Sequence, residues 1–418
     1  MPITFSDDSN RFEGSNGYGE TLAGFDFSVF GGLISNSGTI SGPVTANTTD
    51  WIEIYNSFNG TITKASGSPY AIDLQGAGGK SFFNDGLITG GVRFGTGWDS
   101  FYNTGLVQGQ INLGAGNDEL INHIIPGIDG GVTIGTITGG VFMGSGNDTV
   151  VNNGVMANVF LGSGDDVYRA AQDDRGFSSP LPDGIAAKVY GQGGNDQLTG
   201  GSNNDIFLGG ADNDQLIGNG GKDQLFGQSG NDFILAGDGN DKVVGGEGND
   251  YIDGGNNNDN LSGSNGNDTI FAGNGNDNVN GGNDDDILYG DGGHDKLNGG
   301  AGNDSIKGGL GRDTMTGGAG ADEFIFAANS GKDVIRDFEA GDTIKINLPL
   351  DVFDGFAQIM SHTEFTGAHA VIDLSGLFNE VGEAPKIYHG SELTLLNVSV
   401  DDLNAATFGL LPDILVVG

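Results

Sequence analysis

An aspartate recurs at every ninth position between Gly191 and Asp322, without a slip. These aspartates are Asp196, Asp205, Asp214, Asp223, Asp232, Asp241, Asp250, Asp259, Asp268, Asp277, Asp286, Asp295, Asp304, Asp313 and Asp322. Glycine usually stands two residues before them, as at Gly194, Gly221, Gly230, Gly239, Gly248, Gly266, Gly275, Gly293, Gly302 and Gly311. Carboxylates and backbone carbonyls are the ligands that calcium prefers, and calcium takes about six to eight of them. Since one turn cannot supply so many oxygens, the spacing predicts metal sites that neighbouring turns share.

The apolar residues of the repeat indicate the scaffold that positions these turns. An apolar side chain lies two residues after each aspartate, as at Leu198, Phe207 and Ile270, so the unit reads G-G-x-G-x-D-x-U-x with U apolar. We expect a turn over G-G-x-G-x-D and a short strand over x-U-x, whose U side chain points inward because alternate strand residues face opposite sides. Two such units then make one coil, and stacked coils form two parallel sheets with a thin core.

Two edges of this coil would carry separate stacks of aspartates. One stack contains Asp196, Asp214 and Asp232, and the other contains Asp205, Asp223 and Asp241. Glycine allows left-handed backbone angles that bring turn carbonyls to one point. Asparagine and aspartate tolerate these angles next best, which accounts for the residues that replace glycine at Asn203, Asp212, Asn257 and Asp284.

Alanine in place of the first glycine and a basic residue directly before the aspartate are two other departures from the unit. Ala236 and Ala272 replace the first glycine of their units, and we expect looser turns there. The residues Lys222, His294 and Arg312 directly precede their aspartates, where asparagine is the norm. We expect these three side chains to point outward into solvent.

The charge of the repeat makes its folding depend on ions. Gly191–Asp322 has 22 acidic and 5 basic residues, a net charge of −17. Like charges at close range repel, and glycine loses the most conformational entropy on ordering. Composition alone would favour a disordered linker, but apolar residues at fixed positions relative to the aspartates argue against disorder when calcium is present. Ion binding and folding should therefore be one event.

The nonapeptide unit resembles the repeat of the RTX (repeats-in-toxin) family of calcium-binding proteins. The resemblance implies an all-β fold, namely a right-handed parallel β-roll of stacked 18-residue coils with calcium in the turns. It implies two columns of calcium ions as the cofactors. It also implies a secreted protein that interacts with the type I secretion machinery during export.

Composition limits the other classes of function. The chain has 418 residues, 81 of them glycine, a formal net charge of −40 and no cysteine. The charge argues against nucleic-acid binding, which needs basic patches, and the lack of cysteine excludes disulfides. No apolar run approaches the ~20 residues of a membrane span, so we expect no transmembrane segment.

The two ends of the chain suggest a route out of the cell. The first residues lack the basic and then apolar pattern of a secretory signal peptide. The last six, Asp413–Gly418, place an acidic residue before a short apolar tail, which resembles the C-terminal signal that type I systems read. An ordinary last strand is the alternative for these six residues. We expect the protein to be extracellular, either secreted or associated with the cell surface.

The chain divides into five expected segments. Residues 1–32 would form an N-terminal cap, since a solenoid needs a lid over its end. A second β-solenoid is expected at 33–168, a loop or hinge at 169–190, the RTX β-roll at 191–322 and a capping and secretion-signal domain at 323–418. In the last segment, Phe324–Ile344 resembles the run that closes the β-roll of serralysin-type proteins. Strands at Ala370–Leu374 and Lys386–Tyr388 and a short helix near Asp401–Ala406 should follow.

The second solenoid carries its own two motifs. Asn-x-Gly-x-apolar begins at Asn36, Asn84 and Asn103, with a shortened form at Asn152, and Gly-x-Gly-x-Asp ends at Asp99, Asp118, Asp148 and Asp166. The first and last intervals between these aspartates each equal about one coil, and an insertion near Ile124 accounts for the longer interval between them. These aspartates either bind a weaker column of metal or only cap turns. The repeat resembles those of bacterial surface adhesins and autotransporter passengers.

Enzyme signatures are missing from the sequence. None of the five histidines belongs to a His-Glu-x-x-His zinc motif, and neither a Gly-x-Ser-x-Gly elbow nor a phosphate-binding loop occurs. The surviving enzyme hypothesis is a sugar site on the first solenoid. Its candidate residues are Lys80, Arg93 and Asp99 with nearby Trp98, Phe101 and Tyr102.

These observations favour a secreted calcium-binding structural or adhesive protein of the cell surface or extracellular matrix, of the S-layer, biofilm or adhesin type. It would fold, and self-assemble, on binding calcium outside the cell, with its own copies or a surface polysaccharide as partner. The alternative is a carbohydrate-active enzyme or lectin, of the polysaccharide lyase or epimerase type, that uses the N-terminal solenoid.

Overall fold

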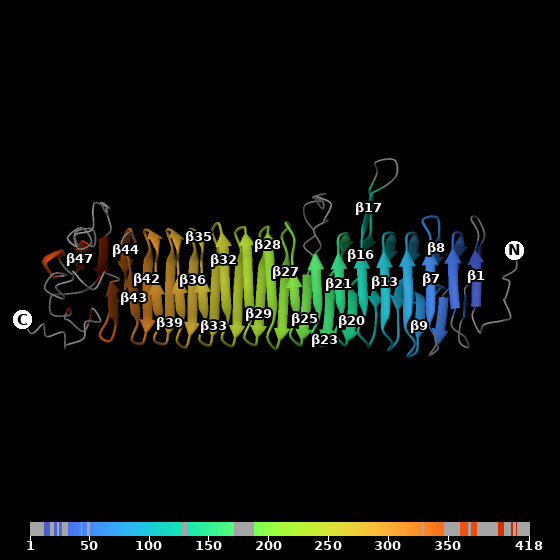
Figure 1. Cartoon of the computed structure of the whole chain (residues 1–418), viewed down its shortest axis with the longest axis horizontal. Helices are drawn as coiled ribbons and strands as arrows, with labels where there is room; N and C mark the ends of the chain where they lie inside the picture. The colour runs from blue at the N-terminus through green and yellow to red at the C-terminus, as the bar shows by residue number, and fades with distance from the viewer. Residues whose placement is uncertain are drawn as a thin grey trace, which may run out of the picture. The chain divides into compact units, whose positions relative to one another are not determined.

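The structure is a computed structural model of the whole chain. It describes residues 12–16, 21–22, 25–26, 32–42, 44–47, 51–126, 132–170, 188–327, 330–346, 360–366, 369–373, 392–396, 403 and 407. The chain divides into two compact units, Met1–Gln215 and Leu216–Gly418. In both, short strands follow one another as successive coils (Figure 1). The predicted all-β solenoid is therefore confirmed.

Most coils of the first unit have three strands, which form three parallel faces. Face A contains β1 (Phe12–Asn16), β4 (Gly32–Asn36), β7 (Ile52–Asn56), β10 (Lys80–Asn84), β13 (Asp99–Asn103), β16 (Glu119–Asn122), β21 (Thr149–Asn152), β24 (Val167–Ala170) and β26 (Gln197–Thr199). Face B contains β2 (Thr21–Leu22), β5 (Thr39–Ile40), β8 (Thr61–Thr63), β11 (Leu87–Thr89), β14 (Leu106–Gln108), β19 (Thr136–Ile137) and β22 (Val155–Met156).

Face C of the first unit contains β3 (Phe25–Asp26), β6 (Val44–Asn47), β9 (Tyr70–Gln75), β12 (Gly91–Arg93), β15 (Ile111–Asn112), β20 (Val141–Ser145), β23 (Val159–Ser163), β25 (Lys188–Gly193) and β27 (Ile206–Ala211). Face B has no strand after β22 among the described residues, so the last coils of this unit have only two strands. The predicted coil length holds at Lys80 and Asp99, which are 19 residues apart and paired. The third strand was not predicted.

Buried asparagines form the corner between faces A and B. Nδ2 of one side chain donates to Oδ1 of the next, at 2.8 to 3.0 Å, through Asn36, Asn56, Asn84, Asn103, Asn122 and Asn152. The glycine that follows in the motif allows close stacking, because a Cβ at Gly86 would lie 2.2 Å from the carbonyl oxygen of Gly60. The Asn-x-Gly motif is thus an internal ladder of the kind that stabilises stacked strands.

Two features interrupt the coils of the first unit. The predicted insertion near Ile124 is an antiparallel hairpin of β17 (Ile124–Pro126) and β18 (Val132–Ile134), which projects at the label β17 in Figure 1. It separates Asn122 from Gly135, which still lies at the same corner, because Nδ2 of Asn122 donates to the carbonyl oxygen of Gly135 at 3.1 Å. Most of the predicted loop at 169–190 lies outside the described residues, so its role as a hinge stays a prediction.

The second unit has two faces, as expected for the nonapeptide repeat. Face D contains β28 (Gln215–Gly220), β30 (Phe233–Asp238), β32 (Tyr251–Asn256), β34 (Thr269–Phe271), β35 (Asn274–Gly275), β37 (Ile287–Tyr289), β38 (Gly292–Gly293), β40 (Ser305–Lys307), β41 (Leu310–Gly311), β43 (Glu323–Phe326) and β45 (Thr343–Ile346). Face E contains β29 (Gln224–Ser229), β31 (Lys242–Glu247), β33 (Asn260–Asn265), β36 (Asn278–Asn283), β39 (Lys296–Ala301), β42 (Thr314–Ala319) and β44 (Lys332–Ile335).

The register on both faces is one coil for every two nonapeptide units. Leu225 pairs with Val243 on face E, and Ile234 pairs with Ile252 on face D. Every U side chain from Leu198 to Phe324 is at most 2 % exposed. The core is therefore one layer of apolar side chains, as predicted, and full burial of each contributes roughly 1.5–3 kcal/mol.

Half of the strands on faces D and E are longer than the repeat suggested, with six residues each. In β29, Leu225 and Gly227 face inward and Gln224 and Phe226 do not, so the first glycine of the unit lies in the strand there. β34, β37 and β40 have the predicted three residues. The prediction of a three-residue strand is therefore confirmed at these strands, and it was wrong for the six-residue strands because it assigned all glycines to the turn.

The C-terminal part changes from coil stacking to antiparallel pairing. β44 pairs in parallel with β42 and with β48 (Glu392–Leu396), and β48 pairs with β47 (His369–Asp373), which pairs with β46 (Thr363–Thr366). The strand expected at Ala370–Leu374 corresponds to β47. The strand expected at Lys386–Tyr388 lies outside the described residues, as does most of the helix expected at Asp401–Ala406. No helix in the described part is long and apolar enough to cross a membrane.

Candidate metal centre

The repeat aspartates point into the solenoid and bond to the neighbouring coil. In the second unit, the backbone amide of each donates to Oδ1 of the aspartate one coil later, at 2.7 to 3.0 Å. One column runs through Asp232, Asp250, Asp268, Asp286, Asp304 and Asp322. The other runs through Asp223, Asp241, Asp259, Asp277, Asp295 and Asp313. The predicted stacking of aspartates on two edges, one coil apart, is thus present within this unit.

In most of these side chains the second carboxylate oxygen, Oδ2, is buried and has no hydrogen-bond partner. The aspartates are at most 3 % exposed, except Asp205 at 8 %. Buried Oδ2 atoms without a partner belong to Asp196, Asp241, Asp250, Asp259, Asp268, Asp277, Asp286, Asp295, Asp304, Asp313 and Asp322. A buried charged oxygen without a partner is costly, and a cation beside it would remove that cost. The carboxylates therefore fit the calcium site that the sequence predicted.

The first glycine of the unit makes room for the carboxylate. A Cβ at Gly227 would lie 2.1 Å from Oδ2 of Asp232, and one at Gly245 would lie 2.1 Å from Oδ2 of Asp250. Such distances are far shorter than any van der Waals contact. The carboxylate therefore occupies the space beside the glycine that lies five residues earlier. The first position of the unit is glycine because a side chain there would collide with this carboxylate.

Left-handed backbone angles occur at two turn positions. Two residues before the aspartate, φ is positive at every glycine named in the prediction, for example 117° at Gly194. It is also positive at Asp212, Asn257 and Asp284, as predicted, but Asn203 does not have a positive φ. Four residues before the aspartate, φ is positive even at Gln192, Asn219, Gln228, Ser264 and Asp291. This position is the second glycine of the unit G-G-x-G-x-D, and the residues that replace that glycine at these five sites keep its left-handed angle.

Burial shifts the carboxyl groups strongly toward the protonated form. Desolvation raises the pKa of Asp250 to about 7, and the carboxylates of Asp232 and Asp268 add to this rise. Desolvation likewise raises the pKa of Asp259 to about 8. Backbone hydrogen bonds to these carboxylates oppose the rise in both cases. Without a cation, the columns are therefore partly protonated at neutral pH.

The residues that precede the aspartates form an outer ladder with the opposite direction. The amide of Asn249 donates to Oδ1 of Asn231, which lies one coil earlier, at 2.6 Å. His294 takes part in the same way, because its Nδ1 accepts from the amide of Arg312 at 2.9 Å. Lys222, His294 and Arg312 are exposed, as predicted.

The weaker candidate aspartates of the first solenoid form a column of the same geometry. Backbone amides donate to Oδ1 of the next aspartate at 2.7 to 2.9 Å along Asp99, Asp118, Asp148, Asp166, Asp196 and Asp214. Oδ2 of Asp99, Asp118, Asp148 and Asp166 is buried and has no partner. The structure thus brings these four residues into line with the first repeat aspartates. Asp205 differs, because its Oδ2 accepts from the amide of Gly201 at 3.0 Å.

Sequence reasoning missed two further members of the columns. Asp333 continues from Asp313 and Asp342 continues from Asp322, each through an amide-to-Oδ1 hydrogen bond of 3.0 Å. Both lie 20 residues after their partner. This coil has two extra residues, so neither aspartate falls on the nine-residue spacing of the repeat. A pattern that allows insertions would have been needed to find them.

Carboxylate and imidazole groups do not converge three at a time anywhere in the described residues. Each column is instead a line of single carboxylates, one per coil. Most oxygens around an ion would therefore be backbone carbonyls of the glycine-rich turns. This agrees with the coordination preference of calcium, which accepts carbonyl and carboxylate oxygens together.

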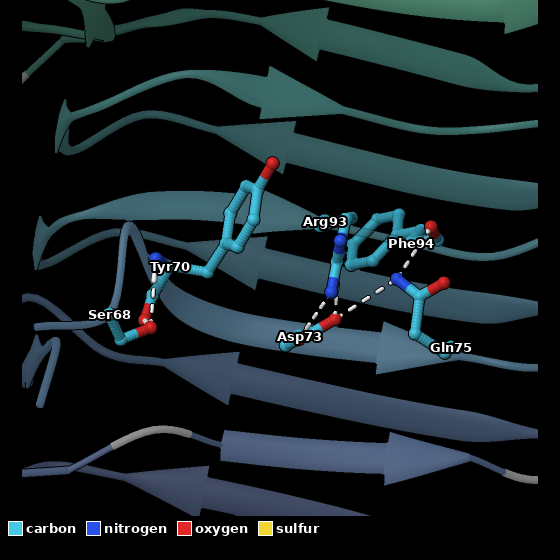
Figure 2. Close-up of polar contacts among 6 residues, drawn as sticks. All are labelled: Ser68, Tyr70, Asp73, Gln75, Arg93 and Phe94. Carbon is cyan, nitrogen blue, oxygen red and sulfur yellow. Dashed lines mark hydrogen bonds and ion pairs between the residues drawn. The ribbon is translucent and has the colours of Figure 1, made fainter.

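The residues considered for a sugar site do not share a surface. Lys80, Asp99 and Phe101 are buried inside the coil at 1 %, 0 % and 0 % exposure, whereas Trp98 is 67 % exposed. The Arg93 guanidinium lies on face C, where it pairs with Asp73 at 2.7 Å (Figure 2). Its Cζ also lies 4.6 Å from the centre of the Tyr70 ring.

A groove of about 440 Å³ in this unit is lined by Thr63, Lys64, Thr89 and Gln108 among others. None of the six residues considered for a sugar site lines it. That prediction was wrong because Lys80 and Asp99 are buried inside the coil, whereas Arg93 belongs to β12 on another face and Trp98 lies in a turn.

A model of the RTX calcium-binding nonapeptide repeat matches this chain at residues 188–216, 217–252, 253–288 and 289–324. Residues 188–324 belong to the RTX calcium-binding repeat family. The repeats of this family bind calcium, so several calcium ions are the cofactors of this segment. Their chemical contribution is positive charge and oxygen coordination at the turns, where the aspartates described above would hold them.

Other comparisons add no functional argument. No curated protein matches the chain. A hyperactive, calcium-dependent, β-helical antifreeze protein from an Antarctic bacterium has 18 % identity, with 84 % of this chain and 88 % of that one covered and a TM-score of 0.34. The extracellular lipase LipA from Serratia marcescens has 15 % identity, with 58 % of this chain and 44 % of that one covered and a TM-score of 0.20. At these TM-scores neither likeness carries an argument.

Proposed function

We propose that the protein is a calcium-loaded structural or adhesive component of a cell surface or extracellular matrix, of the S-layer, biofilm or adhesin type. Type I secretion would export it, and it would fold and self-associate on meeting calcium outside the cell. The observation that carries this proposal is the pair of buried carboxylate columns in an RTX repeat. In most members of these columns Oδ2 is buried without a partner, so the assembled coil would depend on ions that are abundant outside cells and scarce within them.

Side chains on the outer surface support a structural role because they mainly join one coil to the next. Tyr55, Phe83 and Tyr102 stack with centroid distances of 4.6 and 4.9 Å. Nδ2 of Asn274 donates to Oδ1 of Asn256 at 2.9 Å on the exposed side of the second unit. A surface built in this way stiffens the stack and contributes no convergent set of catalytic groups.

The net charge explains how calcium would control self-association. With a formal charge of −40, two copies of the ion-free chain repel each other. Bound calcium removes much of that charge and orders the coils. Association should therefore begin only after the columns fill.

Self-association is tested with the purified full chain in calcium-free buffer. Addition of calcium should increase light scattering, and electron microscopy should show assemblies, whereas magnesium at the same ionic strength should give neither. A chain that is folded and stays monomeric by ultracentrifugation at saturating calcium would overturn the assembly part of the proposal. Export is tested separately by comparing the full chain with one that ends at Ile346. The shorter chain should stay inside cells that carry a type I system.

A further inference from the structure

Lys80 stands where the rest of its column has aspartate. It is the register partner of Asp99 on the next strand, and its backbone amide donates to Oδ1 of Asp99 at 2.8 Å. The preceding turn, Gly76-Ala77-Gly78-Gly79, repeats the pattern of Gly95-Thr96-Gly97-Trp98. The two segments therefore read Gly-x-Gly-x-Lys and Gly-x-Gly-x-Asp.

The two turns also stack closely in space. A Cβ at Gly95 would lie 2.2 Å from the carbonyl oxygen of Gly76, and a Cβ at Gly97 would lie 2.7 Å from that of Gly78. Gly76 has the left-handed φ of 109° that is typical of these turns. The Gly76 turn is thus one more turn of the same series, with a cationic side chain in place of an anionic one.

The ammonium group of Lys80 lies inside this turn. The residue is 1 % exposed, and its Nζ donates to the carbonyl oxygens of Gly78 and Gly76. Burial lowers the pKa of Lys80, while the carboxylates of Asp99 and Asp118 oppose that change. A buried ammonium needs such oxygens around it. The turn therefore already holds a positive charge on the kind of oxygens that calcium prefers.

The next turns of the column have a buried aspartate at the position that Lys80 occupies in its own turn. Asp99, Asp118, Asp148 and Asp166 are at most 2 % exposed, and Oδ2 of each is buried without a partner. The turns before Asp118, Asp148 and Asp166 have left-handed glycines, as at Gly114 and Gly116, whereas Gly95 and Gly97 before Asp99 do not have a positive φ. Where Lys80 supplies a cation, these turns supply negative oxygens and leave the cation to come from solution.

We propose that the Lys80 ammonium is a built-in cation that closes the end of the column, and that a column of bound calcium begins one coil later, at Asp99, and continues through Asp118, Asp148 and Asp166. These sites lie before the segment that matches the RTX family. The coil that contains Lys80 folds without an ion, whereas the four coils after it require one. This inference rests on calcium binding by the chain and does not depend on its role at a surface.

The first test counts calcium bound per chain by elemental analysis after dialysis against calcium. Lys80→Asp restores Gly-x-Gly-x-Asp and should raise the count by one ion. Lys64→Asp is the matched control, since it makes the same change of charge at an exposed residue nearby and should leave the count unchanged. An unchanged count for folded Lys80→Asp, or an equal rise in both variants, would overturn the role of Lys80.

A second test does not depend on how Lys80→Asp folds. Asp118→Asn keeps the oxygen that accepts from Asp99 and removes the charge, so it should lose one or two ions. Asp85→Asn, at an exposed residue, should lose none. An Asp118→Asn chain that binds as many ions as the parent would show that the column does not extend into this solenoid.

Terbium, a luminescent calcium substitute, reports on the first site directly. Trp98 precedes Asp99 and is one of two tryptophans in the chain. Terbium emission excited through tryptophan should be strong in the parent and should fall in both Trp98→Phe and Asp99→Asn, with folding unchanged by circular dichroism. Emission that persists in Asp99→Asn would place the ion elsewhere and overturn the proposed start of the column. Monomeric protein suffices, so the outcome is separate from that of the assembly test.

Discussion

The backbone amide of Asp313 donates to Oδ1 of Asp333 at 3.0 Å, although the two lie two residues further apart in the chain than other neighbours in the column. Oδ2 of Asp333 is buried without a partner, and desolvation raises the pKa of this residue to about 7. The geometry of the repeat therefore continues where its sequence pattern has stopped. The column depends on the position of the carboxylate and not on a perfect nonapeptide.

Asp333→Asn should reduce the calcium bound at saturation by about one ion. The asparagine keeps an oxygen for the amide of Asp313, so the coil should still fold. Glu247→Gln is the control, because Glu247 is exposed and outside both columns. Elemental analysis of the dialysed proteins gives the counts. Equal counts for Asp333→Asn and the parent would limit the metal sites to the nonapeptide repeat.

Calcium should drive folding of the second unit. The repeat has a net charge of −17, and Oδ2 of most of its aspartates is buried without a hydrogen-bond partner. Circular dichroism should show mostly disordered chain in chelator and β-structure after calcium is added. A spectrum that stays the same throughout the titration would contradict coupled folding and binding.

Asp250→Asn and Ile252→Ala separate ligand loss from core loss in one coil. Asp250→Asn retains the acceptor for the amide of Asp232 but removes the charge, so the calcium midpoint should rise and one or two ions should be lost. Ile252→Ala removes a fully buried side chain and should cost roughly 2–5 kcal/mol of stability, with no loss of ions at saturation. Stability in such a stack is nearly a sum over neighbouring coils, so both effects should stay local. If Asp250→Asn binds calcium like the parent, the repeat aspartates are not ligands.

The first glycine of the unit should control calcium affinity. A Cβ at Gly245 would lie 2.1 Å from Oδ2 of Asp250, so Gly245→Ala should displace the carboxylate, raise the calcium midpoint and cost about 1–3 kcal/mol. Ala236 already occupies the equivalent position in another unit, and Ala236→Gly should lower the midpoint. Gly292→Ala is the control, because its nearest neighbour would be 3.4 Å away. If all three variants had the calcium midpoint of the parent, the first glycine would not control the position of the carboxylate.

Much of the second unit could be predicted from the sequence because one period fixes both its core and its columns. The aspartate and the apolar residue of the unit are two residues apart in every copy, as at Asp250 and Ile252, so both face inward. The role of Gly245 could not be predicted. It depends on a contact with a carboxylate five residues later, which only the folded coil shows.

The first unit was harder to predict because its third strands are short. Leu87–Thr89 has three residues and follows Lys80–Asn84 after a corner of two residues, so its start was assigned to the Asn-x-Gly-x-apolar motif and not to a separate strand. The insertion after Asn122 hid one member of the asparagine ladder. Lys80 was not predicted to belong to the column because the motif ends in aspartate elsewhere, although the glycines of its turn are present.

Acid should stabilise the calcium-free fold. Burial raises the pKa of Asp241, and it raises those of Asp268 and Asp259 to about 6 and about 8, from an ordinary value of 3.8. Between about pH 4 and pH 8 the folded state therefore binds more protons than the unfolded state, and the free energy of unfolding falls as pH rises through this window. Calcium must displace these protons, so its affinity should rise over the same window.

The pH dependence is measured on protein freed of calcium by a chelating resin. Circular dichroism should show more β-structure near pH 5 than near pH 8 in the absence of calcium, and the calcium midpoint should be lower near pH 8. Asp259→Asn is the informative variant, since it removes one carboxyl group with a strongly raised pKa and should weaken the pH dependence of the calcium-free fold. Asp285→Asn, at an exposed residue outside the columns, should leave it unchanged. A calcium-free fold that becomes more stable as pH rises would show that the buried carboxylates do not control the stability of the ion-free coils.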